Sequence, residues 1–232
     1  QPVVTGADEL CRGCEVLMRW QHPKQGMISP DRFIPLAEDS GLIVPMTSLL
    51  MAQVRDHFAP HASKLPAGFH FGFNICASHC KDLSLLIDCR AFINAFKDNP
   101  VKLVLELTER ELIVADETTD QLFAELRQLG VMIAIDDFGT GHSSLTYLQQ
   151  FQVDALKIDQ SFVGMIGSDA LSSHIVENVI DLATRLGLQL VAEGVETQVQ
   201  ADYLQARHVD YLQGYLYGRP IPMKQFRQTL FG

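Results

Sequence analysis

The sequence lacks the features that mark a membrane-spanning or secreted protein. No apolar stretch approaches the roughly 20 residues that a membrane-spanning helix needs. No signal-peptide pattern opens the chain. The five cysteines are odd in number and scattered, so they do not form a disulfide framework, and a reducing compartment is favoured. We therefore expect a cytoplasmic domain that does not itself insert into a membrane.

Positive charge is also scarce. The 18 Lys and Arg residues face 28 Asp and Glu residues, which gives a net charge of −10. This balance argues against a protein that a basic face holds on a nucleic-acid polymer. It does not exclude a small phosphate-containing substrate, because bound metal ions would reverse the local field.

Several motifs of other chemistries are missing. None of the eight histidines belongs to an H-E-x-x-H pattern, and the glycine-rich stretch 139–141 lacks the Lys-Ser/Thr of a phosphate-binding P-loop. Cys11 and Cys14 form a C-x-x-C, and a cysteine–histidine cluster lies at 76–80, but no second block has zinc-finger spacing. We interpret these thiols as free and at least partly buried.

The sequence does have the length and alternation of an α/β barrel. Its 232 residues, 47% of them hydrophobic, can bury one large core. Strand-like and helix-like periods alternate along the chain. We expect strands near 2–5, 13–20, 69–76, 101–108, 131–136, 153–158, 188–193 and 210–216. We expect helices over 30–39, 44–58, 83–97, 118–129, 170–186, 197–207 and 222–230. Eight strands with intervening helices predict a TIM-like (β/α)8 barrel.

No linker, repeat or low-complexity segment interrupts this pattern, so residues 1–232 are interpreted as one domain. The chain starts at Gln1 without an initiator methionine and enters an apolar pair at once. We expect it to be excised from a longer multidomain protein, which is a candidate for membrane anchoring.

Acidic residues close several of the apolar runs. Glu106 ends V-K-L-V-L-E, Asp136 and Asp137 end V-M-I-A-I-D-D, and Glu193 ends L-Q-L-V-A-E. Asn74 ends F-H-F-G-F-N in the same way. Parallel barrels keep their chemistry at the carboxyl ends of the strands, where these side chains would meet. Carboxylates that lie close together repel one another unless protons or metal ions neutralise them, so the pattern indicates divalent cations.

The alternation of side chains along each strand supports this convergence. In 101–108, one face carries Leu103, Leu105 and Leu107, and the opposite face carries Glu106. Residues of the same inward register in other strands include His70, Gly72 and Asn74, then Glu15, Leu17 and Arg19, and finally Gln189, Val191 and Glu193. Asp137 has the opposite parity, but it lies where the chain can turn.

The candidate ligands are hard oxygen donors: Glu15, Asn74, Glu106, Asp136, Asp137 and Glu193. They suit Mg²⁺ or Mn²⁺ and exceed the needs of one octahedral ion. Two ions about 3.5–4 Å apart would clamp a phosphodiester and activate water. Lys157 and Arg19 would steady phosphoryl charge. Taken singly, each residue has an ordinary interpretation as a helix cap, ion-pair partner or turn residue; the combination favours a site.

The ordered motifs of the chain extend over nearly its whole length. They are Q-P-V-V at 1–4, E-V-L-M-R-W at 15–20, S-P-D-R-F-I-P-L-A-E at 29–38, F-N-I at 73–75, E-L-T-E at 106–109, D-D-F-G-T-G-H-S-S-L at 136–145, K-I-D-Q-S-F at 157–162, A-E-G-V-E-T at 192–197 and Q-G-Y at 213–215. With these motifs the chain resembles the EAL-domain phosphodiesterases, which hydrolyse cyclic di-GMP to the linear dinucleotide pGpG. The resemblance implies a barrel with one reversed, antiparallel strand.

The resemblance also implies roles for individual residues. Glu15, Asn74, Glu106 and Asp136 would hold one metal ion, and Asp136, Asp137 and Glu193 the second. Lys157, with Glu15 and Glu193, would act in catalysis by orienting water, and Gln213 would lie at the metal–water edge. Arg19 and Leu17 would contact the substrate. Glu109 would anchor the loop 138–145, which couples the metal site to a homodimer interface in the family.

Three departures from the family pattern stand out: E-V-L replaces E-A-L, Cys76 replaces a serine, and His142 replaces a tyrosine. None removes a metal ligand, which favours an active phosphodiesterase. Two alternatives stay open. One is a non-catalytic receptor module for cyclic di-GMP. The other is a different metal-dependent barrel enzyme, such as a lyase, because barrels host many chemistries.

Overall fold

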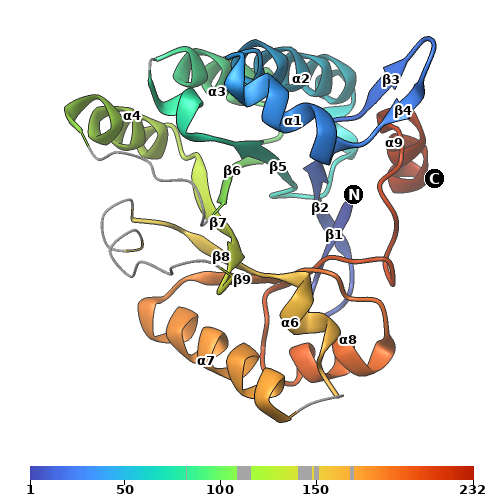
Figure 1. Cartoon of the computed structure of the whole chain (residues 1–232). Coiled ribbons are helices and arrows are strands. Elements are labelled where there is room, and N and C mark those ends of the chain that lie inside the picture. The colour runs from blue at the N-terminus through green and yellow to red at the C-terminus, as the bar shows by residue number, and fades with distance from the viewer. Residues whose placement is uncertain (82, 109–115, 141–147, 149–151, 168–169) are drawn as a thin grey trace.

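The computed structural model forms a closed eight-stranded barrel with helices outside it (Figure 1). The structure describes residues 1–81, 83–108, 116–140, 148, 152–167 and 170–232, without the side chains of 170–173. The barrel strands are β1 (Pro2–Thr5), β2 (Cys11–Val16), β5 (His70–Ile75), β6 (Lys102–Thr108), β7 (Met132–Phe138), β8 (Ala155–Ile158), β9 (Gln189–Ala192) and β10 (Tyr211–Leu212).

Strand β1 is the one reversed member of the barrel. Around the barrel the order is β1-β10-β9-β8-β7-β6-β5-β2. Strand β1 pairs antiparallel with both β2 and β10, whereas every other neighbouring pair is parallel. The TIM-like barrel with one antiparallel strand is therefore confirmed.

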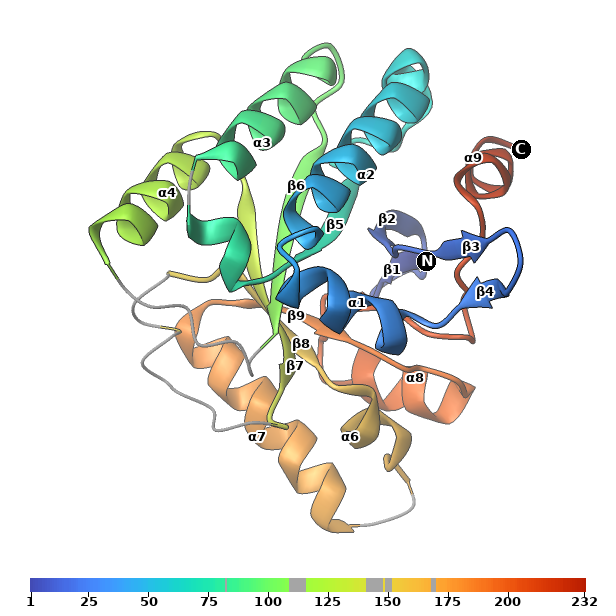
Figure 2. The ribbon, with the colours of Figure 1, turned by 45° about the horizontal axis from the view of Figure 1, so that its top comes forward.

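Helices cover the outside of the barrel. They are α1 (Pro30–Asp39), α2 (Ile43–Phe58), α3 (Ser84–Ala95), α4 (Glu117–Gln128), α6 (Gln160–Gly164), α7 (Ala170–Leu186), α8 (Gln198–Gln205) and α9 (Met223–Phe231), with 3-10 turns η1 (Ala59–Lys64) and η2 (Ala77–Lys81). Helices α2, α3 and α4 lie side by side over one half, and α7 and α8 lie over the other (Figure 2). Every helix expected from the sequence is present, with ends that shift by at most two residues.

Local sequence explains several helix ends. Pro30 begins α1, although the side chain of Ser29 makes no cap hydrogen bond. Gly130 and Gly187 follow α4 and α7 with φ of +78° and +68°, a left-handed conformation that ends helices at little cost for glycine. Thr197 and Gln200 form a capping box at the start of α8.

The aromatic outer face of β5 packs under the helices. Phe71 lies 5.3 Å from Phe58 of α2 and 5.5 Å from Phe92 of α3, ring centre to ring centre. Each such buried ring contributes about 1.5–3 kcal/mol, and each aromatic pair about 0.5–1.5 kcal/mol more. Phe69, Phe73 and the three leucines of β6 are buried on the same outer layer, as the alternation predicts. With these residues outside, Gly72 and Glu106 face the barrel axis.

Two strand predictions were wrong in extent. Strand β2 ends at Val16, and Trp20 begins a separate hairpin of β3 (Trp20–His22) and β4 (Gly26–Ile28). Strand β10 has only two residues, because the carbonyl oxygen of Gly214 accepts hydrogen bonds from Tyr217 and Gly218 and turns the chain. Both corrections place the following residues in loops above the barrel.

Within the described ranges, no single helix has the length and apolarity to cross a membrane. The helical segments 30–39 and 43–64 meet such a criterion only as a pair bent by 119°.

Candidate metal centre

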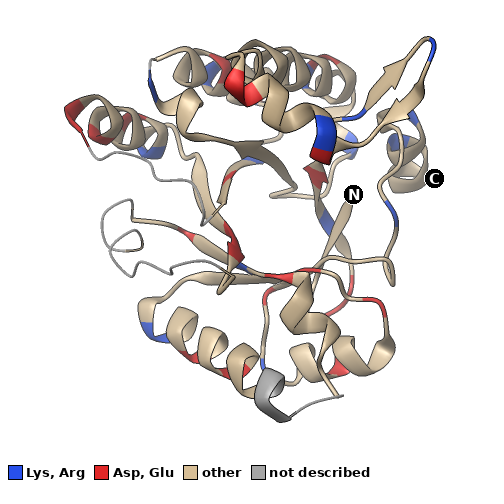
Figure 3. Ribbon diagram, viewed as in Figure 1, with Lys and Arg blue, Asp and Glu red and all other residues tan. Residues whose placement is uncertain are grey.

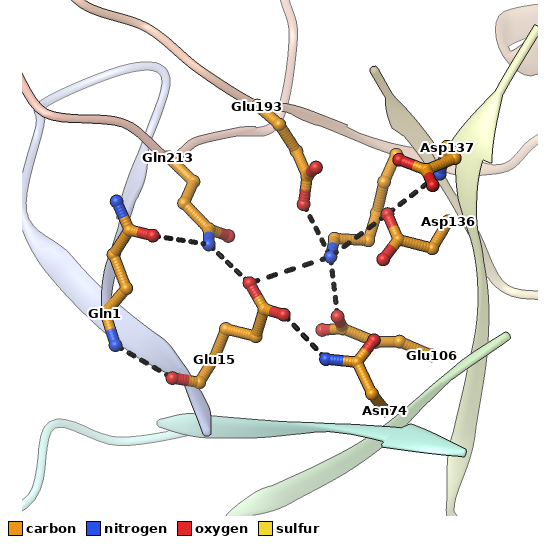
Figure 4. A network of polar contacts seen from close by, with 9 residues as sticks. Gln1, Glu15, Asn74, Glu106, Asp136, Asp137, Glu193 and Gln213 are labelled. Carbon is orange, nitrogen blue, oxygen red and sulfur yellow. Dashed lines mark hydrogen bonds and ion pairs between the residues drawn. The ribbon is translucent and has the colours of Figure 1, made fainter. Parts of the chain in front are cut away.

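Five carboxylates meet at the end of the barrel where the parallel strands terminate (Figure 4). Glu15, Glu106 and Asp136 offer oxygen atoms that all lie within 4.8 Å of one another, and Asp136, Asp137 and Glu193 form a second such group. Asp136 belongs to both. Figure 3 shows that acidic positions also lie along the outer helices. The structure thus brings together every carboxylate that the sequence nominated as a metal ligand.

Lys157 lies at the centre of these acids. Its Nζ atom is 2.5 Å from Glu106 Oε2, 2.6 Å from Glu193 Oε1, 3.3 Å from Asp136 Oδ1 and 3.9 Å from Glu15 Oε2. Its side chain is only 1% exposed. One ammonium therefore faces four carboxylates in a place that water hardly reaches.

The pKa values of the cluster express this imbalance of charge. Burial raises the pKa of Glu106 to about 8, with Glu15 and Asp136 adding repulsion, although Lys157 acts the other way. The pKa of Glu193 is likewise raised well above its usual value, first by burial. Burial alone would lower the pKa of Lys157, but the surrounding carboxylates raise it well above the usual value. Lys157 therefore stays protonated. Some of the carboxyl groups also keep their protons unless further cations bind to the cluster.

Glu15 is buried, but two neighbouring side-chain amides donate hydrogen bonds to its carboxylate. Asn74 Nδ2 donates to its Oε1 at 2.7 Å and Gln213 Nε2 donates to its Oε2 at 2.5 Å. Burial would raise the pKa of Glu15, but the charge of Lys157 and these two bonds lower it overall. The Oε1 atom of Gln213 is buried and has no hydrogen-bond partner within the part of the chain that the structure describes. A buried polar atom of this kind suits a metal-site water or ligand.

Asp137 joins the cluster through an unusual backbone. Its φ is +54°, in the left-handed region, and the pairing of β7 with β8 shifts register between Ile135 and Phe138. Its N–H donates to Asp136 Oδ1 at 2.8 Å. This turn brings the side chain of Asp137 into the cluster, although strand alternation alone would direct it outward. Burial, then the charge of Asp136 and a hydrogen bond with Asp159, raise the pKa of Asp137 to about 6.

Gly72 makes room for Glu106. A Cβ atom at this position would lie 2.2 Å from Glu106 Oε1, far inside contact distance. The glycine faces the axis on the strand next to Glu106, paired with Val104. Gly72 is a supporting residue of the site. Strand alternation predicted its inward direction but not its role in making room for Glu106.

A cavity of about 210 Å³ opens above the acids. Its lining includes Glu15, Asp136 and Glu193, and also Leu17 and Gln213. Arg19 does not line it. The guanidinium donates to the carbonyl oxygen of Met18 at 2.8 Å and borders a neighbouring groove that Glu15 and Leu17 share. Because β2 ends at Val16, the strand parity expected for Leu17 and Arg19 does not apply.

Three residues that the sequence analysis singled out are placed differently. Glu109 and His142 lie outside the described residues. Cys76 is buried, with its Sγ atom 3.2 Å from His79 Nδ1. The five cysteines all lie within the described residues, and none of them forms a disulfide, as expected. The described residues contain no cysteine–histidine group with the geometry of a metal site.

The donor set fits a hard divalent cation. It consists of carboxylates and amides, without an available thiolate, and two carboxylate triads share one member. The cluster can therefore bind metal.

A family model described as "EAL domain" matches residues 1–220. The chain belongs to the EAL-domain family. Over 226 residues, 97% of the chain, this EAL domain is 47% identical to the cyclic di-GMP phosphodiesterase PdeL of Escherichia coli (strain K12). Over 221 residues, 95% of the chain, it is 48% identical to the probable cyclic di-GMP phosphodiesterase PdeG of the same organism. It spans 62% of the length of PdeL and 44% of that of PdeG.

Solved structures share the architecture of this EAL domain. The PaMucR phosphodiesterase in complex with c-di-GMP superposes with a TM-score of 0.85 at 34% identity, over 97% of this chain and 92% of the other. The cAMP-bound EAL enzyme Bd1971 gives a TM-score of 0.88 at 30% identity, over 99% of this chain and 64% of the other.

Proposed function

We propose that the chain hydrolyses cyclic di-GMP to linear pGpG in a metal-dependent reaction. The observation that carries the proposal is the pair of carboxylate triads around Lys157, at the open end of a barrel. Relatives that are 47% and 48% identical bear the name of cyclic di-GMP phosphodiesterase. A related phosphodiesterase, 34% identical, binds c-di-GMP in its solved structure. Since the chain spans only part of these relatives, the activity of the whole protein is part of the proposal.

Two ions of Mg²⁺ or Mn²⁺ would balance the charge of the site. Five carboxylates against one ammonium leave four net negative charges when all are ionised, and two divalent cations neutralise them. Glu15, Asn74, Glu106 and Asp136 would hold one ion, and Asp136, Asp137 and Glu193 the other. When bound, such ions polarise a phosphodiester and lower the pKa of water.

The side chains of the protein would then orient the reactants. Lys157 would steady the attacking water and the phosphoryl charge, with Glu15 and Glu193 fixing the geometry around it. The oxygen of water bonds to phosphorus, the 3′ oxygen leaves and takes a proton, and the second proton of water goes to solvent. Leu17, Gln213 and, after a change of side-chain conformation, Arg19 would contact the substrate.

A receptor that binds cyclic di-GMP without cleaving it is the alternative. Such a receptor is expected to lack one or more of the metal-ligating residues, and none of the carboxylates is missing from this set. The complete set favours hydrolysis.

Chromatography of products tests the proposal. The chain is incubated with cyclic di-GMP and Mg²⁺, with Mn²⁺, or with a chelator, and we expect pGpG only when metal is present. Glu15→Ala and Asp137→Ala should abolish the product, whereas Asp98→Ala, at an exposed position between α3 and β6, should not. Near-native turnover of the first two variants would refute the site. Binding without product in every metal would support the receptor.

Three broader expectations stay predictions: a homodimer, a place in a longer multidomain protein, and a cytoplasmic location of this domain. Light scattering with and without substrate tests the first. A monomer at high concentration in both conditions would contradict it.

A further inference from the structure

A second cavity, which we call the side cavity, lies beside the barrel and is separate from the one above the acids. Its walls come mainly from residues 2–12 and 217–230, so it lies between the outer face of β1 and β2 and the helix α9 (Figure 1). Its volume is about 560 Å³, within the roughly 300–1,000 Å³ of typical ligand pockets. None of the described residues lines both cavities. A ligand in the side cavity would therefore leave the metal centre free.

Much of the lining of the side cavity is apolar. Val4 of β1 and Phe226 of α9 are buried, and Ile221 and Leu230 are partly buried in the same lining. Leu10, directly before β2, also lines the cavity, although its side chain is 50% exposed. Covering such concave aliphatic surface with an apolar group removes it from water, which is favourable. The lining thus favours a ligand with an aliphatic body.

The side cavity also carries two guanidinium groups without a carboxylate partner. Arg12 of β2 lines it, and within the described ranges its guanidinium enters no hydrogen bond or ion pair. Arg219 lines it as well; its guanidinium lies 4.0 Å from the ring centre of Tyr215 and has no acidic partner in the same ranges. The one carboxylate in the lining, that of Glu9, already accepts hydrogen bonds from two neighbouring side chains. In a chain with a net charge of −10, this local excess of positive charge favours an anion.

The pairing of β1 favours a small molecule over a peptide. An extended peptide binds a sheet by adding to a free strand edge. Strand β1 has no free edge, because it pairs with β10 on one side and with β2 on the other. A ligand without backbone amides needs no such edge. A carboxylate with an aliphatic chain matches both the guanidinium groups and the apolar lining.

We propose that the side cavity binds an amphipathic carboxylate of the class of medium-chain fatty acids. The guanidinium groups of Arg12 and Arg219 hold the carboxylate, and the alkyl chain covers Val4, Ile221 and Phe226. This binding site goes beyond the proposed hydrolysis and does not depend on it, since it uses none of the metal ligands.

Calorimetric titration of the chain with dodecanoate, in chelator and below the micelle concentration, tests the proposal. We expect saturable binding at a single site. Decanoate should bind about tenfold more weakly, because each buried methylene contributes roughly a factor of three to four in affinity. Butyrate, which lacks the long chain, and dodecyltrimethylammonium, whose charge is opposite, should show no saturable binding at the same concentrations.

Single substitutions locate the binding site. Arg12→Gln and Arg219→Gln should each weaken dodecanoate binding by about tenfold, the loss expected for a charge-assisted hydrogen bond. Arg32→Gln, at an exposed position of α1, is the matched control and should keep the wild-type affinity. Leu10→Ser should weaken binding about fivefold, whereas Leu186→Ser, at a position 48% exposed at the end of α7, should not. Circular dichroism checks that each variant is folded.

Three outcomes would overturn the proposal. They are no saturable binding of dodecanoate, wild-type affinity in both arginine variants of the cavity, and equal binding of dodecanoate and dodecyltrimethylammonium, which would mean apolar adsorption only. A peptide of alternating glutamate and leucine is the rival probe. If this peptide binds where dodecanoate does not, and Arg12→Gln removes its binding, the cavity receives an acidic protein segment instead.

Discussion

Replacing Lys157 by methionine should destabilise the metal-free protein more than any other single change in the site. The substitution keeps most of the volume of the side chain but removes the ammonium that contacts four carboxylates at 2.5–3.9 Å. Removing one partner of a buried ion pair costs about 3–5 kcal/mol, because the remaining charge is left without compensation. That is a large part of the roughly 5–15 kcal/mol that stabilises a folded domain.

Urea unfolding followed by circular dichroism measures the effect. With a chelator present at pH 8, we expect the midpoint of Lys157→Met to fall by about 1–2 M urea. At pH 6 the loss should be smaller, because Glu106 and Glu193, whose pKa values are raised, can take up protons instead. Saturating Mg²⁺ should also reduce the loss, because bound cations replace the missing positive charge.

Lys102→Met is the matched control. Lys102 begins β6, at the opposite end of the strand from Glu106, and its side chain is exposed. We expect its effect to stay within about 0.5 kcal/mol. If Lys157→Met unfolded at the wild-type midpoint in chelator, the carboxylates would not depend on the ammonium, and the account of the site would be refuted.

Two further predictions concern the pH dependence of stability and the close packing of Gly72 against Glu106. Between pH 6.5 and 8, the metal-free folded state binds more protons than the unfolded chain, because the folded pKa of Glu106 is about 8 against its usual 4.5 and that of Glu193 is raised as well. The free energy of unfolding should therefore fall with rising pH by up to about 1.4 kcal/mol per unit for each group, and Mg²⁺ should remove the slope. Burial lowers the pKa of His70 from its usual 6.5 to about 4. This residue therefore affects stability only below pH 6.5, where the unfolded chain takes up a proton that the folded state does not, so the free energy of unfolding falls as the pH falls. A flat pH profile of urea midpoints in chelator would contradict this. Gly72→Ala should push Glu106 aside, cost about 1–3 kcal/mol and reduce turnover; an unchanged kcat would show that the position of Glu106 is not critical.

The sequence was sufficient to locate the barrel strands and the acids at their ends. Leu103, Leu105 and Leu107 are buried outside, which fixes the inward register of Glu106 between them. A one-residue slip would turn the acid toward the apolar helix layer and the leucines toward the polar barrel mouth, so the register is strongly determined. The β3–β4 hairpin was not predictable in this way, since each of its strands has three residues and Ile28 is the one buried residue among them.

Asp137 shows where parity fails. Alternation along β7 directs its side chain away from Asp136, and only the left-handed φ of +54° with the shifted β7–β8 register returns it to the cluster. A non-glycine residue in this conformation costs about 1–3 kcal/mol, which surrounding contacts must offset. The hydrogen bond from Asp137 N to Asp136 Oδ1 is one such contact.

Whether the position of a site residue could be predicted depends on whether a strand or a loop contact positions it. The carboxylates lie on or directly after strands, whose hydrogen-bonded register positions them before any loop is formed. Glu196 and Tyr215 lie on loops, and the hydrogen bonds of Val195 and the close approach at Gly214 place them. Sequence periodicity carries no information about such contacts. The metal centre is therefore the part of the site that strands determine, whereas the cavity wall that Glu196 and Tyr215 line depends on the loops.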